Sequence, residues 1–385
     1  MSFPAKRFNT ICFICMFLLG FSFAIYQSLI QDINLFLGFD GAQSGLLVAV
    51  FFVGALVSPG ITGELGDRIG KRMLSILSGG AMLFGIAIVS QARDAALVIA
   101  GIFLMGAGYN ALLGLLYAKI IDYNPHTARR IANFSSSTFC LGAVLGPLLS
   151  LAIRSMGGNW QRIMLINVFL FFPIILLLLW IPSDKQTAST NKPARNRAYS
   201  LDLIKDVRFL IFFFSIILYV GAEVALSFSV ISYFAAVSLP ALGEIALSLF
   251  WAGMIVGRFL AGVFYKQSGR IIILCLTASA VFSLLLQLAP PPLVSVALFC
   301  LIGLSMSALW PLLMALCTQT FSQFSGTASG LMAVGSSLGG IFLPALMGPL
   351  TNLFGVRRSI AFTTASLALV LVFNLRNRKN HQETT

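Results

Sequence analysis

Charged side chains are scarce in this sequence. Only 10% of its 385 residues are charged, whereas 58% are hydrophobic, and an ordinary soluble domain carries about 25% charged residues. So few charges cannot cover the surface of a water-soluble chain of this length, so lipid must be the solvent for most of it. This composition excludes soluble enzymes, secreted disulfide-built domains and nucleic-acid-binding proteins, and it makes membrane lipid an expected partner.

Histidine is nearly absent, and the cysteines form no ligand set. The two histidines, His126 and His381, lie in polar segments, which excludes a histidine proton relay and a histidine-ligated metal. Cys12 and Cys15 form a CxxC inside an apolar run with no second pair, so helix packing explains them better than metal or redox chemistry. A phosphate-binding GxxxxGK[ST] is also missing. We therefore expect no enzyme, no metal and no cofactor.

Long apolar segments make up most of the chain. A spanning helix needs about 20 mostly apolar residues, and twelve segments qualify: 11–35, 43–62, 73–91, 95–120, 131–154, 160–181, 208–236, 242–264, 271–289, 292–317, 326–350 and 358–375. The sequence thus predicts an all-α membrane protein of twelve transmembrane helices. Two six-helix bundles, residues 1–181 and 208–385, are separated by a polar, basic linker over 182–207.

The basic residues indicate the orientation. With the N-terminus in the cytoplasm, 18 of the 25 lysines and arginines fall in cytoplasmic segments, as the positive-inside rule requires. The excess positive charge then serves topology and contacts anionic lipid, and nucleic acid is not an expected partner. Both termini are predicted to be cytoplasmic, and the compact loops favour a bacterial inner membrane.

The two halves of the sequence resemble each other at an offset of about 200 residues. The segment Gly63–Arg72 after the second span has the same order of glycine, charge, glycine and base as Gly262–Arg270 after the eighth. Gly106 in the fourth span likewise corresponds to Gly303 in the tenth. Paired six-helix repeats are typical of transporters that rock about a site near the middle of the membrane. We therefore predict that the two bundles are pseudo-symmetric.

These residues carry a resemblance to the major facilitator superfamily. The segment Gly63–Arg72 is similar to the signature loop between helices two and three of that superfamily. The stretches 219–224, 253–259 and 330–349, with Trp310-Pro311, more narrowly resemble its fucose–galactose–glucose:proton symporters. Asn110 stands in the fourth span, where members of that group can carry an acid.

Glu223 is the acid predicted to lie deepest in a span. It falls about 15 residues into a span that begins near Arg208, roughly 22 Å along a helix of 1.5 Å rise per residue. An acid at that depth normally faces a bundle interior or water and marks a functional site. The sequence favours Glu223 as a proton-coupling residue, with Asp32 as the second candidate. The alternative is a neutral glutamate that serves packing alone.

Polar residues at helical spacing recur on several spans. In the superfamily that the sequence resembles, spans one, four, seven and ten line the central cavity. That resemblance implies a set of substrate-binding candidates on those spans: Gln27, Gln31, Asn110, Tyr117, Tyr219, Ser227, Ser307 and Trp310. Their amides, hydroxyls and indole suit a polyhydroxylated neutral ligand or an aromatic one. Each residue has the alternative role of a hydrogen bond between helices.

The signature segment is expected to act on conformation rather than on the solute. The resemblance implies a cytoplasmic latch that closes the outward-open state, formed by Gly63, Asp67, Arg68, Gly70 and Lys71 with Asp122 and Arg129. Solvated loop charges are the alternative.

The sequence therefore predicts a secondary transporter that works by alternating access. The leading hypothesis is a monomeric, proton-coupled symporter of a small organic solute, with a sugar as the candidate. The alternative is a proton-coupled exporter of drugs or hydrophobic metabolites, which the Gly142-xxx-Gly146-Pro147 motif and the phenylalanine-rich spans also fit. A receptor without transport is disfavoured, because the sequence holds no sizeable segment outside the spans.

Overall fold

The computed structural model describes residues 5–39, 43–124, 127–181, 203–263 and 268–383, and every regular element in them is helical. For residues 5, 59–68, 128–130, 260–263, 268, 325–326 and 377–383 it describes only the backbone. The first half contains α1 (Ala5–Leu37), α2 (Leu46–Ile69), α3 (Lys71–Gln91), α4 (Ala95–Tyr123), α5 (Ala128–Ser155), α6 (Trp160–Phe171) and α7 (Pro173–Trp180). The second contains α9 (Val207–Ala235), α10 (Pro240–Val263), α11 (Ser268–Gln287), α12 (Pro292–Met306), α13 (Leu309–Thr320), a short 3-10 turn (Ser322–Phe324), α14 (Ser325–Phe354) and α15 (Val356–Glu383).

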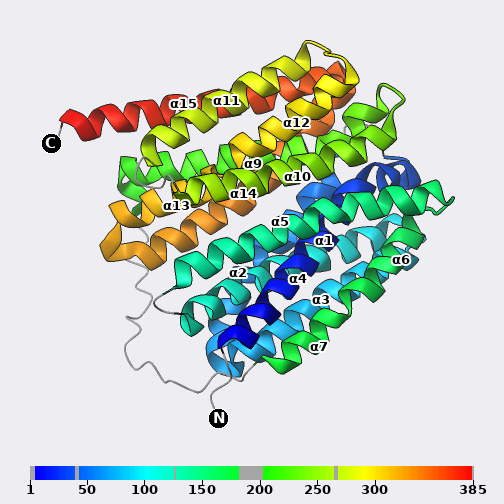
Figure 1. The fold of residues 1–385 in the computed structure, drawn as a ribbon, viewed down its shortest axis with the longest axis horizontal. Coiled ribbons are helices and arrows are strands. Elements are labelled where there is room, and N and C mark those ends of the chain that lie inside the picture. Colours follow the sequence, from blue (N-terminus) through cyan, green and yellow to red (C-terminus); the bar gives the residue numbers. More distant parts are fainter. Residues whose placement is uncertain (1–4, 40–42, 125–126, 182–202, 264–267, 384–385) are drawn as a thin grey trace.

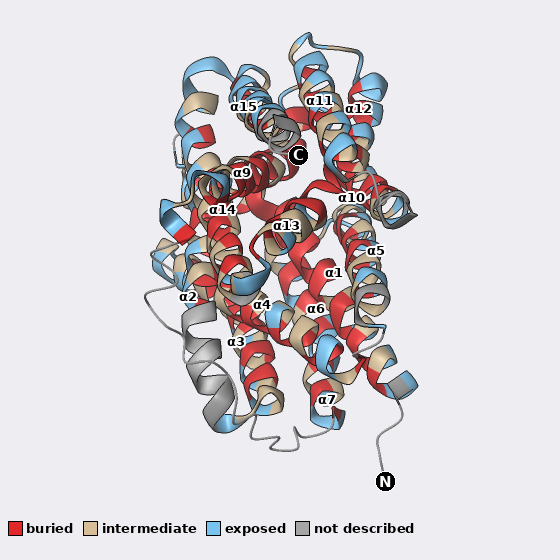
Figure 2. Ribbon diagram, turned by 90° about the vertical axis from the view of Figure 1, so that its left-hand side faces the viewer, coloured by how far each residue is buried: buried red, intermediate tan, exposed pale blue. Residues whose placement is uncertain are grey.

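The helices confirm an all-α membrane fold. Eleven described segments are long and apolar enough to span a membrane, and the remaining predicted span is α2, which is apolar over Leu46–Ser58. Large apolar side chains project from the outer faces, with Phe84, Phe169 and Phe259 between 62% and 72% exposed. Figure 2 shows the buried residues concentrated in the interior of the molecule and the exposed ones on the outward faces and at the ends.

Two predicted spans are interrupted. Residues 160–181 form α6 and α7, which meet at Phe172 before Pro173, and residues 292–317 are divided between α12 and α13 at Ser307. Proline causes both breaks because it lacks the amide hydrogen that would bond the carbonyl four residues earlier. For Pro311 that carbonyl belongs to Ser307, whose own hydroxyl donates to the Leu304 carbonyl at 2.8 Å.

The segment Gly63–Arg72, predicted to be a loop, is mostly helical. The α2 helix continues to Ile69, and α3 begins at Lys71, so that a single residue forms the turn. Gly70 has a φ of +82°, a backbone conformation that glycine adopts without the steric cost that other residues meet. The glycine at position 70 therefore allows a single residue to connect α2 and α3.

Two bundles are visible in Figure 1: α1–α7 form the lower one and α9–α15 the upper one. In the first, α1 packs on α5, α4 on α2, and α6 on α3. In the second, α9 packs on α14, α12 on α10, and α15 on α11. The order of contacts is the same in both halves, which confirms the pseudo-symmetric pair of six-helix bundles.

Glycines at equivalent positions bring the helices of each bundle into contact. A methyl group on Gly106 would overlap the carbonyl oxygen of Phe51 where α4 crosses α2, and one on Gly303 would overlap that of Phe250 where α12 crosses α10. Small residues permit this close approach of backbones, which is the main source of helix association in lipid. The sequence repeat therefore corresponds to a helix crossing that occurs in both bundles.

The GxxxGP motif has the same physical role. Gly142 faces the backbone of Phe17, and Gly146 faces that of Phe21, where α5 crosses α1. In the second half, Gly339 faces the backbone of α9 in the same manner. These glycines are therefore explained by helix packing, whichever way a solute moves.

The two bundles meet at the end of the molecule away from the chain termini. The backbone of Gly45 at the start of α2 lies against Pro344 of α14, and α5 packs along α10. In contrast, α7 and α13 contact mainly helices of their own bundles. Both marked chain ends lie at the opposite side in Figure 1. The structure is thus closed at the end distant from the termini.

We expect Gly106→Ala to destabilise the fold, because its methyl group would force α2 and α4 apart and overpacking costs about 1–3 kcal/mol. Thermal unfolding of the purified protein in detergent measures the effect as a lower Tm. Gly114→Ala, on the same helix, is the control, since nothing lies within 4 Å of the position of its methyl group. Equal Tm values for the two variants would contradict the packing role of Gly106.

Candidate functional site

A buried polar network joins the two bundles near their centre. Gln27 of α1 donates from Nε2 to Oγ of Ser227 on α9 at 3.0 Å, and the indole nitrogen of Trp251 on α10 donates to Gln27 Oε1 at 2.9 Å. All three side chains are buried. Gln27 and Ser227 are predicted site residues that the structure brings together. Trp251 was missed, although an indole N–H in a span needs an acceptor.

Aromatic rings surround this network. Phe23 stacks on Tyr109 at 5.1 Å between centroids and makes edge contacts with Phe228 at 5.9 Å and Trp251 at 6.2 Å. These contacts join α1 to α4 in its own bundle and to α9 and α10 in the other. Phe51 and Phe139 complete the cluster. The centre of the protein is therefore an aromatic enclosure with few polar groups.

Glu223 lies one helical turn from Ser227 and contacts Tyr219. The Tyr219 hydroxyl is within hydrogen-bond distance of Glu223 Oε2 and lies 3.0 Å from the carbonyl oxygen of Met306. A tyrosine hydroxyl has one hydrogen to donate, and a carbonyl can only accept. Both contacts are hydrogen bonds only if Tyr219 donates to Met306 and Glu223 donates to Tyr219. This geometry fits a protonated Glu223.

Arg258 of α10 supplies a positive charge within electrostatic range of this acid. Its guanidinium donates to the carbonyl oxygen of Ser136 on α5 at 3.2 Å and to the hydroxyl of the same residue. It also interacts electrostatically with Glu223 and Tyr117. The sequence analysis did not single out Arg258. An arginine inside a span is the signal that could have marked it as a candidate.

The other predicted site residues include Tyr117 and Asn110, both on α4. Tyr117 joins the central region through a hydrogen bond with Ser136. Asn110 instead donates to the Ala55 carbonyl at 2.7 Å, so its amide connects α4 to α2 within one bundle.

The remaining three candidates, Gln31, Ser307 and Trp310, lie in the first and tenth predicted spans. Gln31 is half-buried on α1, one turn beyond Gln27. Ser307 lies at the break between α12 and α13, and Trp310 is 40% exposed and donates to Ser336 Oγ at 3.2 Å. None of these three shares a described hydrogen bond with Gln27, Glu223 or Arg258, but the backbone of Trp310 hydrogen-bonds the Tyr219 hydroxyl.

Asp32 and Glu223 lie on opposite sides of Gln27. The α1 and α9 helices run in the same direction, because Gln27 faces Ser227 and, further along, Asn34 and Ser232 line one pocket. Glu223 therefore lies towards the terminus end and Asp32 towards the closed end. Asp32 pairs with Arg154 of α5 at 2.5 Å, so it does not belong to the site around Glu223.

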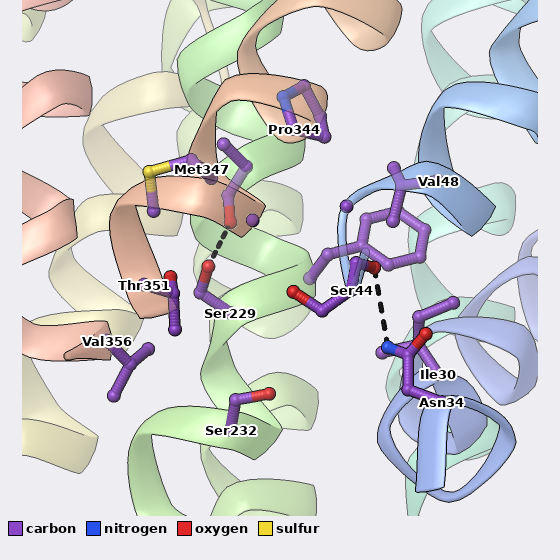
Figure 3. A pocket seen from close by; sticks show the side chains of 14 residues that line it. Ile30, Asn34, Ser44, Val48, Ser229, Ser232, Pro344, Met347, Thr351 and Val356 are labelled. Carbon is purple, nitrogen blue, oxygen red and sulfur yellow. Dashed lines mark hydrogen bonds between the residues drawn. The ribbon is translucent and has the colours of Figure 1, made fainter. Parts of the chain in front are cut away.

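Figure 3 shows the pocket at the closed end, between α1, α2, α9 and α14. Its volume is about 60 Å³, below the 300–1,000 Å³ typical of small-molecule sites. Two of its polar groups bond to nearby backbone: Asn34 donates to the Ser44 carbonyl at 3.3 Å, and Ser229 donates to the Ala225 carbonyl at 2.6 Å. The pocket is therefore too small to be the solute site in this conformation.

The predicted latch is described only in part. The side chains of Asp67, Arg68 and Arg129 are outside the described part of the structure, and only the helical backbone is described for Gly63. Lys71 forms an ion pair with Asp122, which joins the start of α3 to the end of α4 beside the turn at Gly70. This pair lies within one bundle.

Known proteins with related sequences are transporters. The family model of the Major Facilitator Superfamily matches residues 12–344. This chain belongs to the major facilitator superfamily. It is therefore a transporter and not an enzyme, and its helices place it in the membrane as a multi-pass protein.

Individual relatives are distant. The chain is 25% identical to an uncharacterized MFS-type transporter, YfkL of Bacillus subtilis, over 91% of this chain and 90% of that one. It is 23% identical to a putative glucose/galactose transporter of Helicobacter pylori over 96% of both. A glucose/mannose transporter of Bacillus subtilis, GlcP, is 21% identical over 91% of this chain and 86% of its own. A match to an uncharacterized Caenorhabditis elegans protein covers 44% of this chain and 32% of that protein.

Solved structures share the fold. The nucleoside transporter NupG superposes with a TM-score of 0.75 at 15% identity, over 96% of this chain and 99% of its own. FucP, a fucose:proton symporter of E. coli solved in the outward conformation, gives 0.69 at 16% identity over 95% and 97%. At such low identity these likenesses establish architecture alone.

Trp251→Phe should weaken the junction between the bundles, because it keeps an aromatic ring but leaves Gln27 Oε1 buried without its donor. An unsatisfied buried acceptor costs about 1–3 kcal/mol, so thermal unfolding in detergent should begin at a lower temperature. Trp180→Phe is the control, since Trp180 is 73% exposed at the end of α7. If both variants unfold at the same temperature as the parent protein, the Trp251–Gln27 hydrogen bond does not contribute to stability.

Proposed function

We propose that this transporter is a proton-coupled symporter of a small, neutral, polyhydroxylated solute, with a sugar as the first candidate. The observation that carries the proposal is the contact of Tyr219 with both Glu223 and the Met306 carbonyl. Because Tyr219 has a single hydrogen, a proton on Glu223 allows both contacts to be hydrogen bonds. Glu223 is therefore the group that binds the coupling proton.

Release of that proton requires a counter-charge for the carboxylate. An uncompensated charge is costly in a buried site, and Arg258 is within electrostatic reach of Glu223. Arg258 is held from the other bundle through Ser136 on α5. A movement of the bundles that breaks this bond changes the position of the guanidinium, which links the protonation of Glu223 to the conformation of the protein.

The composition of the enclosure supports a sugar. Gln27, Ser227 and Trp251 satisfy one another in this conformation, so a solute that separates them must offer donors and acceptors in return. Several hydroxyl groups meet that need, and aromatic rings accommodate the apolar face of a pyranose. The names of the Helicobacter pylori relative and of GlcP, which describe sugar transporters, support the same solute class.

The GxxxGP motif gives no support to the exporter alternative, because its glycines are explained by the packing of α5 on α1. We further propose a monomer in a bacterial inner membrane with both termini in the cytoplasm. Residues 1–181 and 208–385 are then the two rocking units, joined by a cytoplasmic linker over 182–207. The latch of Asp67, Arg68 and their neighbours remains part of this proposal.

Glu223→Gln is the test of coupling, because glutamine keeps the shape of the acid but mimics its protonated form. In proteoliposomes with an imposed pH gradient and a panel of radiolabelled sugars, accumulation against a gradient should stop. Counterflow of the same sugar should survive, since exchange needs only the loaded carrier to rock.

Asp94→Asn is the matched control for that assay. Asp94 is an exposed carboxylate that caps α4 by accepting from the Leu97 amide at 2.9 Å, and asparagine is an equally good N-cap, so both accumulation and counterflow should be unchanged. Undiminished pH-driven accumulation by Glu223→Gln would contradict the assignment and transfer the carrier role to Asp32. Counterflow of no sugar in the parent protein would contradict the solute class.

Orientation is tested by labelling. In a variant whose six native cysteines are replaced, Ser155→Cys at the closed end should react with a membrane-impermeant thiol reagent applied to intact cells. Ser322→Cys at the terminus end should react only after the cells are opened. Both positions are exposed, so access alone separates them, and the reverse pattern would overturn the proposed topology.

A further inference from the structure

Three charged side chains meet where the two bundles close. Arg154, in the last turn of α5, pairs with Asp32 of α1 through Nη1 at 2.5 Å and with Glu244 of α10 through Nε at 3.3 Å. Arg154 also donates to the Ser28 carbonyl at 3.2 Å. Only the contact with Glu244 crosses from one bundle to the other. This ion pair therefore joins the bundles through charged groups at the closed end.

The charges of this cluster do not balance. Two carboxylates share one guanidinium, and Glu244 interacts electrostatically with both Arg154 and Asp32. Glu244 is 3% exposed, whereas the side chain of Asp32 is 26% exposed. In the part of the chain that the structure describes, Glu244 Oε2 accepts no hydrogen bond. If both acids are ionised, one buried negative charge has no partner, which is costly.

We propose that Glu244 is a second proton-binding site, distinct from Glu223, whose occupancy holds the closed end shut. With a proton on Glu244, the cluster is one neutral acid beside a balanced Asp32–Arg154 pair. Opening of this end carries Glu244 away from Arg154 and into water, where it ionises freely. The closed conformation therefore binds one proton more than the open one.

The direction of the pH effect follows from that difference. A conformation that binds an additional proton is favoured as the pH falls, so acid closes this end and base opens it. The dependence is limited to about tenfold per pH unit for a single proton. On the proposed topology the site faces the outside, so the protein senses external pH. The proton on Glu244 returns to the same side when the end reopens and is not transported.

Every described charged group that faces Glu244 belongs to this cluster: Asp32 from α1 and Arg154 from α5. On the side of α9, Gly243 packs against Ile231 and Phe234, which are apolar. The charged neighbours of Glu244 are therefore one acid, Asp32, and one base, Arg154.

A distance measurement across the closed end tests the proposal without any solute. Spin labels at Ser155→Cys on α5 and Ala241→Cys on α10, in the cysteine-replaced full chain reconstituted in nanodiscs, report the separation by pulsed electron spin resonance. Both positions are exposed. Between pH 5 and 9 the short-distance population should fall with rising pH, by up to about tenfold per unit in the ratio of closed to open states.

Two variants remove the charge imbalance in different ways. Glu244→Gln makes the acid permanently neutral, and Asp32→Asn leaves a balanced Arg154–Glu244 pair. In both, the short-distance population should stay high at every pH. Asp94→Asn, an exposed acid at the same end outside the cluster, should keep the pH response of the parent protein.

Two outcomes overturn the proposal: a parent protein whose distances do not change with pH, or a response that survives unaltered in both Glu244→Gln and Asp32→Asn. Glu223→Gln separates this inference from the proposed function. Its distances should still respond to pH, whereas its accumulation of sugar should stop. A pH response that is lost in Glu223→Gln and kept in Glu244→Gln would assign the sensing proton to Glu223 and reject the site at Glu244.

Discussion

The absence of water from the membrane interior governs this structure. A polar group inside the bundles must find its partner within the protein, because lipid offers none. Gln27 shows the consequence most clearly: both ends of its amide are satisfied by residues of the other bundle, Ser227 and Trp251. The conformation in which the bundles meet is therefore defined by hydrogen bonds that a solute has to replace if it binds at the centre, as proposed.

Much of the fold could be predicted because lipid imposes a simple rule on sequence. Apolar length predicted the spans, and the repeat of Gly106 at Gly303 predicted a pair of related bundles. The breaks at Phe172 and Ser307 were not predicted, although Pro173 and Pro311 are visible in the sequence. A proline inside an apolar run can either kink a spanning helix or end it, and only neighbouring contacts decide which.

The candidate site could be predicted only for residues that lie together on one helix. Tyr219 and Glu223 lie one turn apart on the same helix, so spacing alone brought them together. Trp251 and Arg258 were missed because their partners, Gln27 and Ser136, lie on other helices more than 100 residues away. Asn110 shows the converse difficulty: its spacing was equally suitable for the cavity, yet its amide bonds to the backbone of α2.

Glu223 and Glu244 occupy different electrostatic settings, and this difference separates the roles proposed for them. Glu223 and Arg258 can form a balanced pair once the proton leaves, so that either protonation state of Glu223 can be accommodated within the same interior. Glu244 shares Arg154 with Asp32, so its ionised form is accommodated only after the bundles part. A group that tolerates both states can carry a proton through a transport cycle, whereas one that tolerates only the neutral state in the closed form reports which conformation the protein has adopted. The number of carboxylates for each arginine, more than the depth of the acid in the membrane, therefore distinguishes a carrier from a sensor.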